Sequence, residues 1–149
     1  MPGIFVGVDG SPNSEHALRW AMQEAAVRHA PLTVIAVHEV LKSYWTGNPV
    51  SLQADKGKLD ETKKAAEDLA DKVASHLGDA KPHSITVRAV DGFAAQELIE
   101  ASKDADLVVV GSRGGGGFAR LMMGSVSSQV VHHSACPVVV IPHTEAQED

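Results

Sequence analysis

Glycine and serine residues with a regular spacing occur in the stretch VGSRGGGGFARLMMGSVSSQV, residues 110–130. Gly111, Gly114 and the pair Gly124-Ser125 form the pattern G-x2-G-x9-G-S. Glycine has no side chain, so its backbone N–H groups can approach a ligand closely, and a helix N-terminus favours anions. The spacing predicts a phosphate-binding site, and the alternative is a flexible loop that binds no ligand.

The two ends of this pattern have different expected roles. Gly111 and Gly114 would let the backbone turn close to a sugar and its first phosphate. The N–H groups of Ser125, Val126 and Ser127 would meet the outer phosphates, because the first N–H groups of a helix have no partner within it. The Ser125 hydroxyl could add a donor or bind a metal ion through its lone pairs.

Composition excludes several other classes of function. The chain has 149 residues and a net charge of -6, so a polyanionic partner would be repelled and nucleic acid is not expected. The sequence contains neither a Walker-type G-x4-G-K-[ST] motif nor a G-x-S-x-G nucleophile elbow. Its single cysteine, Cys136, cannot form an internal disulfide, and no apolar run approaches membrane-spanning length. We therefore expect one cytoplasmic domain over residues 1–149, with no membrane partner.

Short β-branched runs alternate with longer segments of helical periodicity. Strands are expected at residues 4–9, 32–40, 84–90, 105–111 and 137–142. The signal Ser11-Pro12 predicts a helix start, and helices are expected at about 12–29, 58–77 and 94–103 and from Ser125 to before Pro137. Val126, Val130 and Val131 should form the apolar side of the last helix.

This alternation predicts an α/β fold with an open, parallel five-stranded sheet and helices on both faces. Ligands bind such sheets beyond the carboxyl ends of the strands, where the strand order reverses. With the order 3-2-1-4-5, the first and fourth strands are neighbours. The segment GVDGSPNS and the glycine-rich stretch would then border one crevice.

Three segments together resemble the universal stress protein family in its ATP-binding branch. They are VGVDGS at residues 6–11, ADLVVVGSRGGGG at 105–117 and GSVSSQVVHHSACPVVVIP at 124–142. The resemblance covers nearly the whole chain and implies a fold like that of the adenine nucleotide alpha hydrolases. Where many members have a proline soon after the glycine that follows strand three, this chain reads Gly92-Phe93-Ala94.

The resemblance also implies where ATP, with Mg²⁺, would bind. Gly7 and Asp9 would line the site, although Asp9 could instead be a turn or helix-capping residue. The backbone of His38, Glu39 and Val40 would contact adenine. Ribose and phosphates would lie against a set of residues from the glycine-rich stretch: Gly111, Ser112, Arg113, Gly114, Gly124, Ser125, Val126 and Ser127.

Three functions stay open on these residues. An ATP-binding regulatory module in stress response or dormancy, with slow or absent hydrolysis, is favoured. A slow ATPase or phosphotransfer enzyme of the same fold, or a stress-response dimer not regulated by nucleotide, are the alternatives. The only cationic side chains near the glycine pattern are Arg113 and Arg120, which favours binding over turnover.

The expected edge strand, Pro137 to Pro142, exposes unpaired backbone groups beside a row of valines. Antiparallel pairing with a second copy would cover it and resembles the family's usual dimer. Residues 41–57 form a long connection that would be a mobile lid over adenine or a surface for an unidentified protein partner. Residues 143–149 are expected to be a disordered acidic tail.

Overall fold

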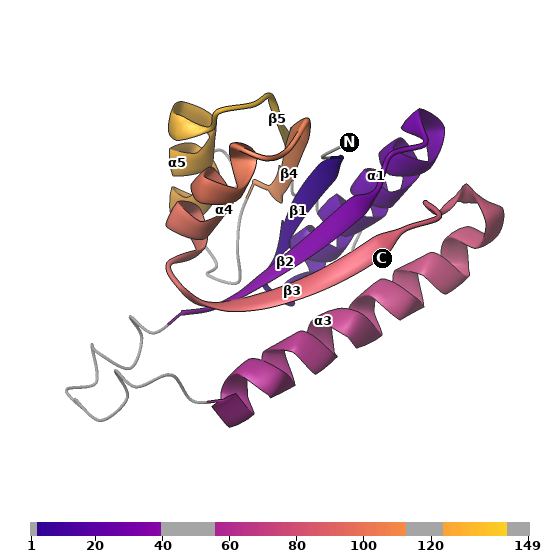
Figure 1. Cartoon of the computed structure of the whole chain (residues 1–149), viewed down its shortest axis with the longest axis horizontal. Helices are drawn as coiled ribbons and strands as arrows, with labels where there is room; N and C mark the ends of the chain where they lie inside the picture. The colour runs from indigo at the N-terminus through magenta and orange to yellow at the C-terminus, as the bar shows by residue number, and fades with distance from the viewer. Residues whose placement is uncertain (1–2, 40–55, 113–123, 143–149) are drawn as a thin grey trace.

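A parallel five-stranded sheet is the centre of the computed structural model, which describes residues 3–39, 56–112 and 124–142 (Figure 1). The strands are β1 (Ile4–Val8), β2 (Leu32–Glu39), β3 (Ile85–Gly92), β4 (Leu107–Gly111) and β5 (Val138–Ile141). They are hydrogen-bonded in the order β3-β2-β1-β4-β5, and every pair of neighbours is parallel. The predicted fold class and strand order are confirmed.

Helices cover both faces of this sheet. They are α1 (Pro12–Arg28), α3 (Lys56–Leu77), α4 (Ala94–Ser102) and α5 (Ser125–His133), with a 3₁₀ turn, η2 (Gly78–Ala80), after α3. Helices α1 and α3 lie on one face and α4 and α5 on the other (Figure 1). Strand β1 is buried on both sides, because Ile4 and Val6 pack towards α1 and α3 whereas Phe5 packs towards α4 and α5.

Helix α1 starts where the sequence predicts. Ser11 is its N-cap, and the Ser11 side chain accepts a hydrogen bond from the N–H of Ser14 at 3.2 Å. Pro12 follows in the first turn, where a missing N–H costs nothing. The helix ends at Arg28, and its C-cap, His29, has a left-handed backbone (φ 55°, ψ 40°) before the chain enters β2.

Two expectations near the helices need correction. Helix α3 begins at Lys56, so the last two residues of the expected connection 41–57 are helical; residues 41–55 and 143–149 lie outside the described part of the chain. Val131 is 44% exposed, whereas Val130 is fully buried. Helix α5 contacts the core along Val126 and Val130, which are four residues apart, and the next residue points away.

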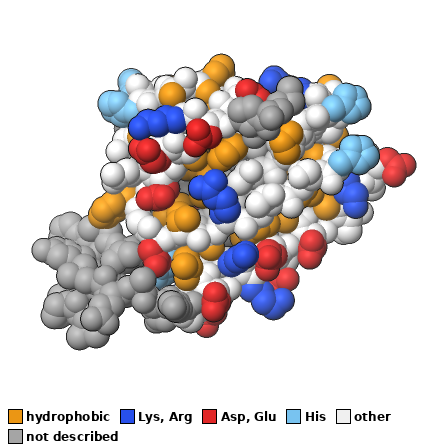
Figure 2. Space-filling view, viewed as in Figure 1, with side chains coloured by type: hydrophobic (Ala, Val, Ile, Leu, Met, Phe, Trp, Pro, Cys, Tyr) orange, Lys and Arg blue, Asp and Glu red, His pale blue; other side chains and the backbone are white. Residues whose placement is uncertain are grey.

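Charged side chains of both signs gather along the outer side of α3 (Figure 2). On its inner side, Ala66, Ala70 and Val73 are buried against the sheet. Helix α3 is thus amphipathic, with a charged outer side facing solvent. Within the described ranges, no helix combines the length and apolarity that a membrane span needs.

Candidate functional site

Hydrogen bonds connect the end of β4 to the start of α5, and we call this connection the β4–α5 joint. The N–H of Gly124 donates to the carbonyl of Ser112, and the Ser127 hydroxyl lies 3.1 Å from the carbonyls of both Ser112 and Gly124. Ser127 is only 3% exposed. Two segments that the sequence predicted to share a phosphate site are therefore in direct contact.

Helix α5 presents its N-terminus at this contact. Its N-cap is Gly124, which has no side chain to cap the helix, and Ser125 is exposed. The first intrahelical bond runs from the N–H of Ser128 to the carbonyl of Gly124 at 3.0 Å. The preceding N–H groups, those of Ser125, Val126 and Ser127, have no acceptor within the helix and carry the positive end of its dipole.

A buried side chain that sequence reasoning missed lies beside this contact. Asn13, in the first turn of α1, is 2% exposed. Its Nδ2 donates to the carbonyl of Ile141 at 3.2 Å, and its Oδ1 lies 3.4 Å from the Ser112 hydroxyl. The helical spacing could have indicated that Asn13 is buried, because it precedes Ala17 and Ala21 by one and two turns on the buried side of α1.

Asn13 also gives Gly111 a structural reason. A Cβ on Gly111 would lie 2.9 Å from Oδ1 and 3.0 Å from Cγ of Asn13. The absence of a side chain at this position leaves room for the buried amide. Its expected approach to a ribose stays a prediction.

Gly7 has a similar explanation on the other face of the sheet. It lies within β1, and a Cβ there would be 2.8 Å from Cδ1 of Leu98 in α4. The glycine therefore allows α4 to pack closely on the sheet. This contact needs no ligand, and the place of Gly7 in a nucleotide site stays a prediction.

Asp9 holds the turn between β1 and α1. Its Oδ1 accepts a hydrogen bond from the N–H of Ser11 at 2.9 Å, and its own N–H lies 3.2 Å from the hydroxyl of Ser14. These are the contacts of a turn residue that supports a helix cap. Asp9 is nevertheless exposed at the carboxyl end of β1, so a second role towards a ligand is sterically open.

The expected adenine end lies on the neighbouring strands. His38 and Glu39 are the last residues of β2 and pair with Asp91 and Gly92 of β3. The Nδ1 of His38 is 2.9 Å from Oδ1 of Asp91, and both side chains are half-buried. Three of the predicted site residues, Val40, Arg113 and Gly114, lie outside the described part of the chain.

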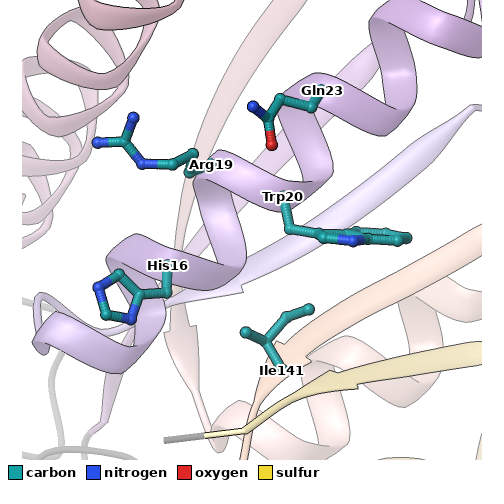
Figure 3. A pocket seen from close by; sticks show the side chains of 5 residues that line it. All are labelled: His16, Arg19, Trp20, Gln23 and Ile141. Carbon is teal, nitrogen blue, oxygen red and sulfur yellow. The ribbon is translucent and has the colours of Figure 1, made fainter. Parts of the chain in front are cut away.

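A shallow cleft of about 360 Å³ runs between α1 and the end of β5. Figure 3 shows its lining, which consists of His16, Arg19, Trp20 and Gln23 from one side of α1 together with Ile141 of β5. Ile141 also contacts the candidate site. Its side chain lines the cleft, and its carbonyl accepts the hydrogen bond from Asn13.

Comparison with known proteins identifies the family. The model of the universal stress protein family matches residues 2–142. A universal stress protein of Mycolicibacterium smegmatis is 35% identical over 139 residues, which are 93% of this chain and 47% of that protein. The chain belongs to the universal stress protein family, and it spans about half the length of the curated relatives that it matches.

Solved structures agree with this family and fold. A universal stress protein in complex with cAMP is 27% identical, with a TM-score of 0.65 over 94% of this chain and 95% of that one. A universal stress protein of Archaeoglobus fulgidus in complex with dAMP is 23% identical, with a TM-score of 0.60 over 93% and 96% of the two chains. At that lower identity the second likeness supports the fold alone.

Proposed function

We propose that this chain binds ATP at the carboxyl edge of the sheet, between the end of β4 and the start of α5, and acts as a regulatory nucleotide-binding module. The observation that carries the proposal is the joint between Ser112, Gly124 and Ser127. It sets the N-terminus of α5, without a side-chain cap, beside the strand end where ligands of such sheets bind. The related structure that holds cAMP supports an adenine nucleotide as the ligand class.

Mg²⁺ fits the side chains at this edge. The carboxylate of Asp9 and the hydroxyl of Ser125 are both exposed, and oxygen ligands of this kind suit Mg²⁺, which is usually bound by few protein groups together with substrate phosphates. When bound, the ion would neutralise phosphate charge. The protein's own part is to hold the phosphates on the N–H groups of Ser125, Val126 and Ser127.

The adenine ring would lie at the ends of β2 and β3. The backbone of His38 and Glu39, together with Val40, would contact the base in this arrangement. The side chains of His38 and Asp91 join this end of the two adjacent strands through a 2.9 Å contact.

Hydrolysis would be slow or absent. Asp9 is the carboxylate that the sequence places in the predicted site, and the N–H of Ser11 already donates to it. The Oδ1 that accepts this bond is engaged in the turn between β1 and α1, which leaves it less available to activate a water molecule. The proposed output is therefore a change in conformation or association rather than turnover.

We also propose a homodimer through β5. This strand is at the edge of the sheet, is bonded to β4 on one side, and its residues Val138–Ile141 are half-buried in the single chain. Antiparallel pairing with the same strand of a second copy would satisfy its outer backbone groups.

Two measurements test nucleotide binding. Mass spectrometry of nucleotide released from denatured, freshly purified protein should detect ATP, and calorimetric titrations should rank ATP above AMP and cAMP. Ser125→Ala should weaken ATP binding several-fold, because it removes a donor at the helix start. Ser75→Ala, on the exposed side of α3, is the matched control and should not change the affinity. A protein that carries no nucleotide and gives no heat with any of the three would overturn the proposal.

A further inference from the structure

Asn13 connects three elements that are distant in sequence. It lies in α1, its Nδ2 bonds the carbonyl of Ile141 in β5 at 3.2 Å, and its Oδ1 lies 3.4 Å from the hydroxyl of Ser112 after β4. At 2% exposure it is one of four buried polar residues in the described part of the chain. Burying an amide is costly unless it is hydrogen-bonded, so the contacts with Ile141 and Ser112 matter to the fold.

The contacts continue on each side of Asn13. The carbonyl of Ile141 also accepts from the N–H of Ser112 at 2.8 Å. The carbonyl of Ser112 accepts from Gly124 and lies 3.1 Å from the hydroxyl of Ser127. Ser112 is thus bonded to β5 through its N–H and to α5 through its carbonyl.

We propose that Asn13 is a positioning residue that couples nucleotide occupancy at the β4–α5 joint to the stability of edge strand β5. The inference rests on the proposed function, because phosphates bound at the start of α5 are its input. Bound phosphates hold Ser125, Val126 and Ser127 in place, and Ser127 holds the carbonyl of Ser112. Asn13 then fixes Ser112 and the last residue of β5 relative to α1.

Strand β5 can change its local stability when nucleotide binds at the β4–α5 joint. It has four residues and, among the residues that the structure describes, is paired with β4 alone, so its local opening should cost less than that of the central strands. A ligand that binds the closed joint more tightly than the open one lowers the population of the open form. Opening of β5 would also change the shape of the cleft beside it, because the side chain of Ile141 lies opposite Trp20 there (Figure 3).

An amide suits this position for a chemical reason. It offers a donor and an acceptor together, so it satisfies the Ile141 carbonyl and the Ser112 hydroxyl at the same time. Asn13→Asp keeps the acceptor for Ser112 and loses the donor for Ile141. Asn13→Ala loses both and removes the polar group from the core.

Hydrogen exchange of the full chain with and without saturating ATP tests the coupling. In the wild type, ATP should slow exchange of peptides from α5 and also of peptides that cover β5, the latter by roughly tenfold, a typical coupling between two sites. In Asn13→Asp and Asn13→Ala, the protection of α5 should persist while that of β5 falls to less than about twofold. Glu15→Gln, which changes the half-buried partner of Lys72 two residues after Asn13, should behave as the wild type.

The outcomes separate the two proposals. If ATP protects neither α5 nor β5 and calorimetry shows no binding, the proposed function fails. If ATP protects α5 of the wild type and leaves β5 unchanged, the coupling fails and nucleotide binding stands; this result needs no variant. Protection of β5 that survives intact in a folded Asn13 variant would also overturn the role of Asn13.

Discussion

The Nδ1 of His38 lies 2.9 Å from Oδ1 of Asp91, across the second-to-last registered pair of β2 and β3. In parallel register, residues that pair directly across two strands point to the same face of the sheet. The contact therefore fastens the carboxyl ends of two neighbouring strands at the place where the base of a nucleotide is proposed to lie.

Asp91→Ala should lower the free energy of unfolding by about 0.5–1.5 kcal/mol, the usual net value of one hydrogen bond. Asp91→Asn should restore most of this loss, since an amide oxygen can still accept from the imidazole.

His38→Ala should change ATP affinity by less than about twofold if the base is contacted through the backbone, because a side-chain truncation leaves those groups in place. Urea unfolding and calorimetric titration measure the two effects, and a large affinity loss in His38→Ala would assign the base contact to the imidazole.

Gly111→Ala should lower the stability of the protein, whereas Gly124→Ala should lower its affinity for ATP. A Cβ at Gly111 would lie 2.9 Å from the buried amide of Asn13, so this variant should lose about 1–3 kcal/mol of stability. Gly124 has φ -66° and ψ 163°, which any residue adopts, so Gly124→Ala should keep its melting temperature. Its methyl group at the helix start should nevertheless weaken ATP binding about tenfold by obstructing the phosphates. Unchanged affinity in a folded Gly124→Ala protein would remove the phosphate assignment.

Asp9 can be tested in both of its roles with two variants. Asp9→Ala removes the acceptor of the 2.9 Å bond from Ser11 and should cost about 0.5–2 kcal/mol, as loss of a helix-capping contact does. Asp9→Asn keeps that acceptor and should recover the stability. If Asp9 also orients Mg²⁺, both variants should lose the magnesium dependence of ATP binding, because an amide is a poorer ligand than a carboxylate. Titrations with and without magnesium decide, and full magnesium dependence in Asp9→Asn would leave Asp9 a turn residue only.

Local signals predicted most of the fold. Runs of β-branched residues gave five strands in the correct order, and the serine before Pro12 gave the start of α1. The glycine-serine spacing also located the start of α5 at Ser125. These features are encoded within a few residues, so they can be recognised without knowledge of distant contacts.

The long-range contacts of the candidate site were not predictable in the same way. His38 and Asp91 are separated by 53 positions, and Asn13 reaches Ser112 and Ile141 over 99 and 128 positions. Gly7 and Gly111 stay predicted ligand contacts, and a Cβ on either would also meet a packed side chain, Leu98 or Asn13. A glycine that admits a ligand and a glycine that admits a neighbouring side chain look alike in sequence.

The last prediction concerns assembly through β5. Val139 packs with the α1 and α3 side of the sheet and Val140 with the α4 and α5 side, and both are half-buried in the single chain. If a second copy pairs with this strand, a lysine at either position places a charge in or beside the interface, and burial of an unpaired charge is strongly unfavourable. Val139→Lys or Val140→Lys should therefore shift the protein towards monomer.

Sedimentation equilibrium at micromolar concentrations measures this shift. Val27→Lys is the matched control, because Val27 lies on α1 and is 75% exposed, so the same charge there meets solvent. We expect the wild type and the control to sediment as dimers and at least one β5 variant to dissociate. A monomeric wild type would refute the homodimer. A dimer that survives both β5 substitutions would place its interface on another surface, since one edge strand cannot pair across a two-fold axis while accommodating a buried lysine on either side.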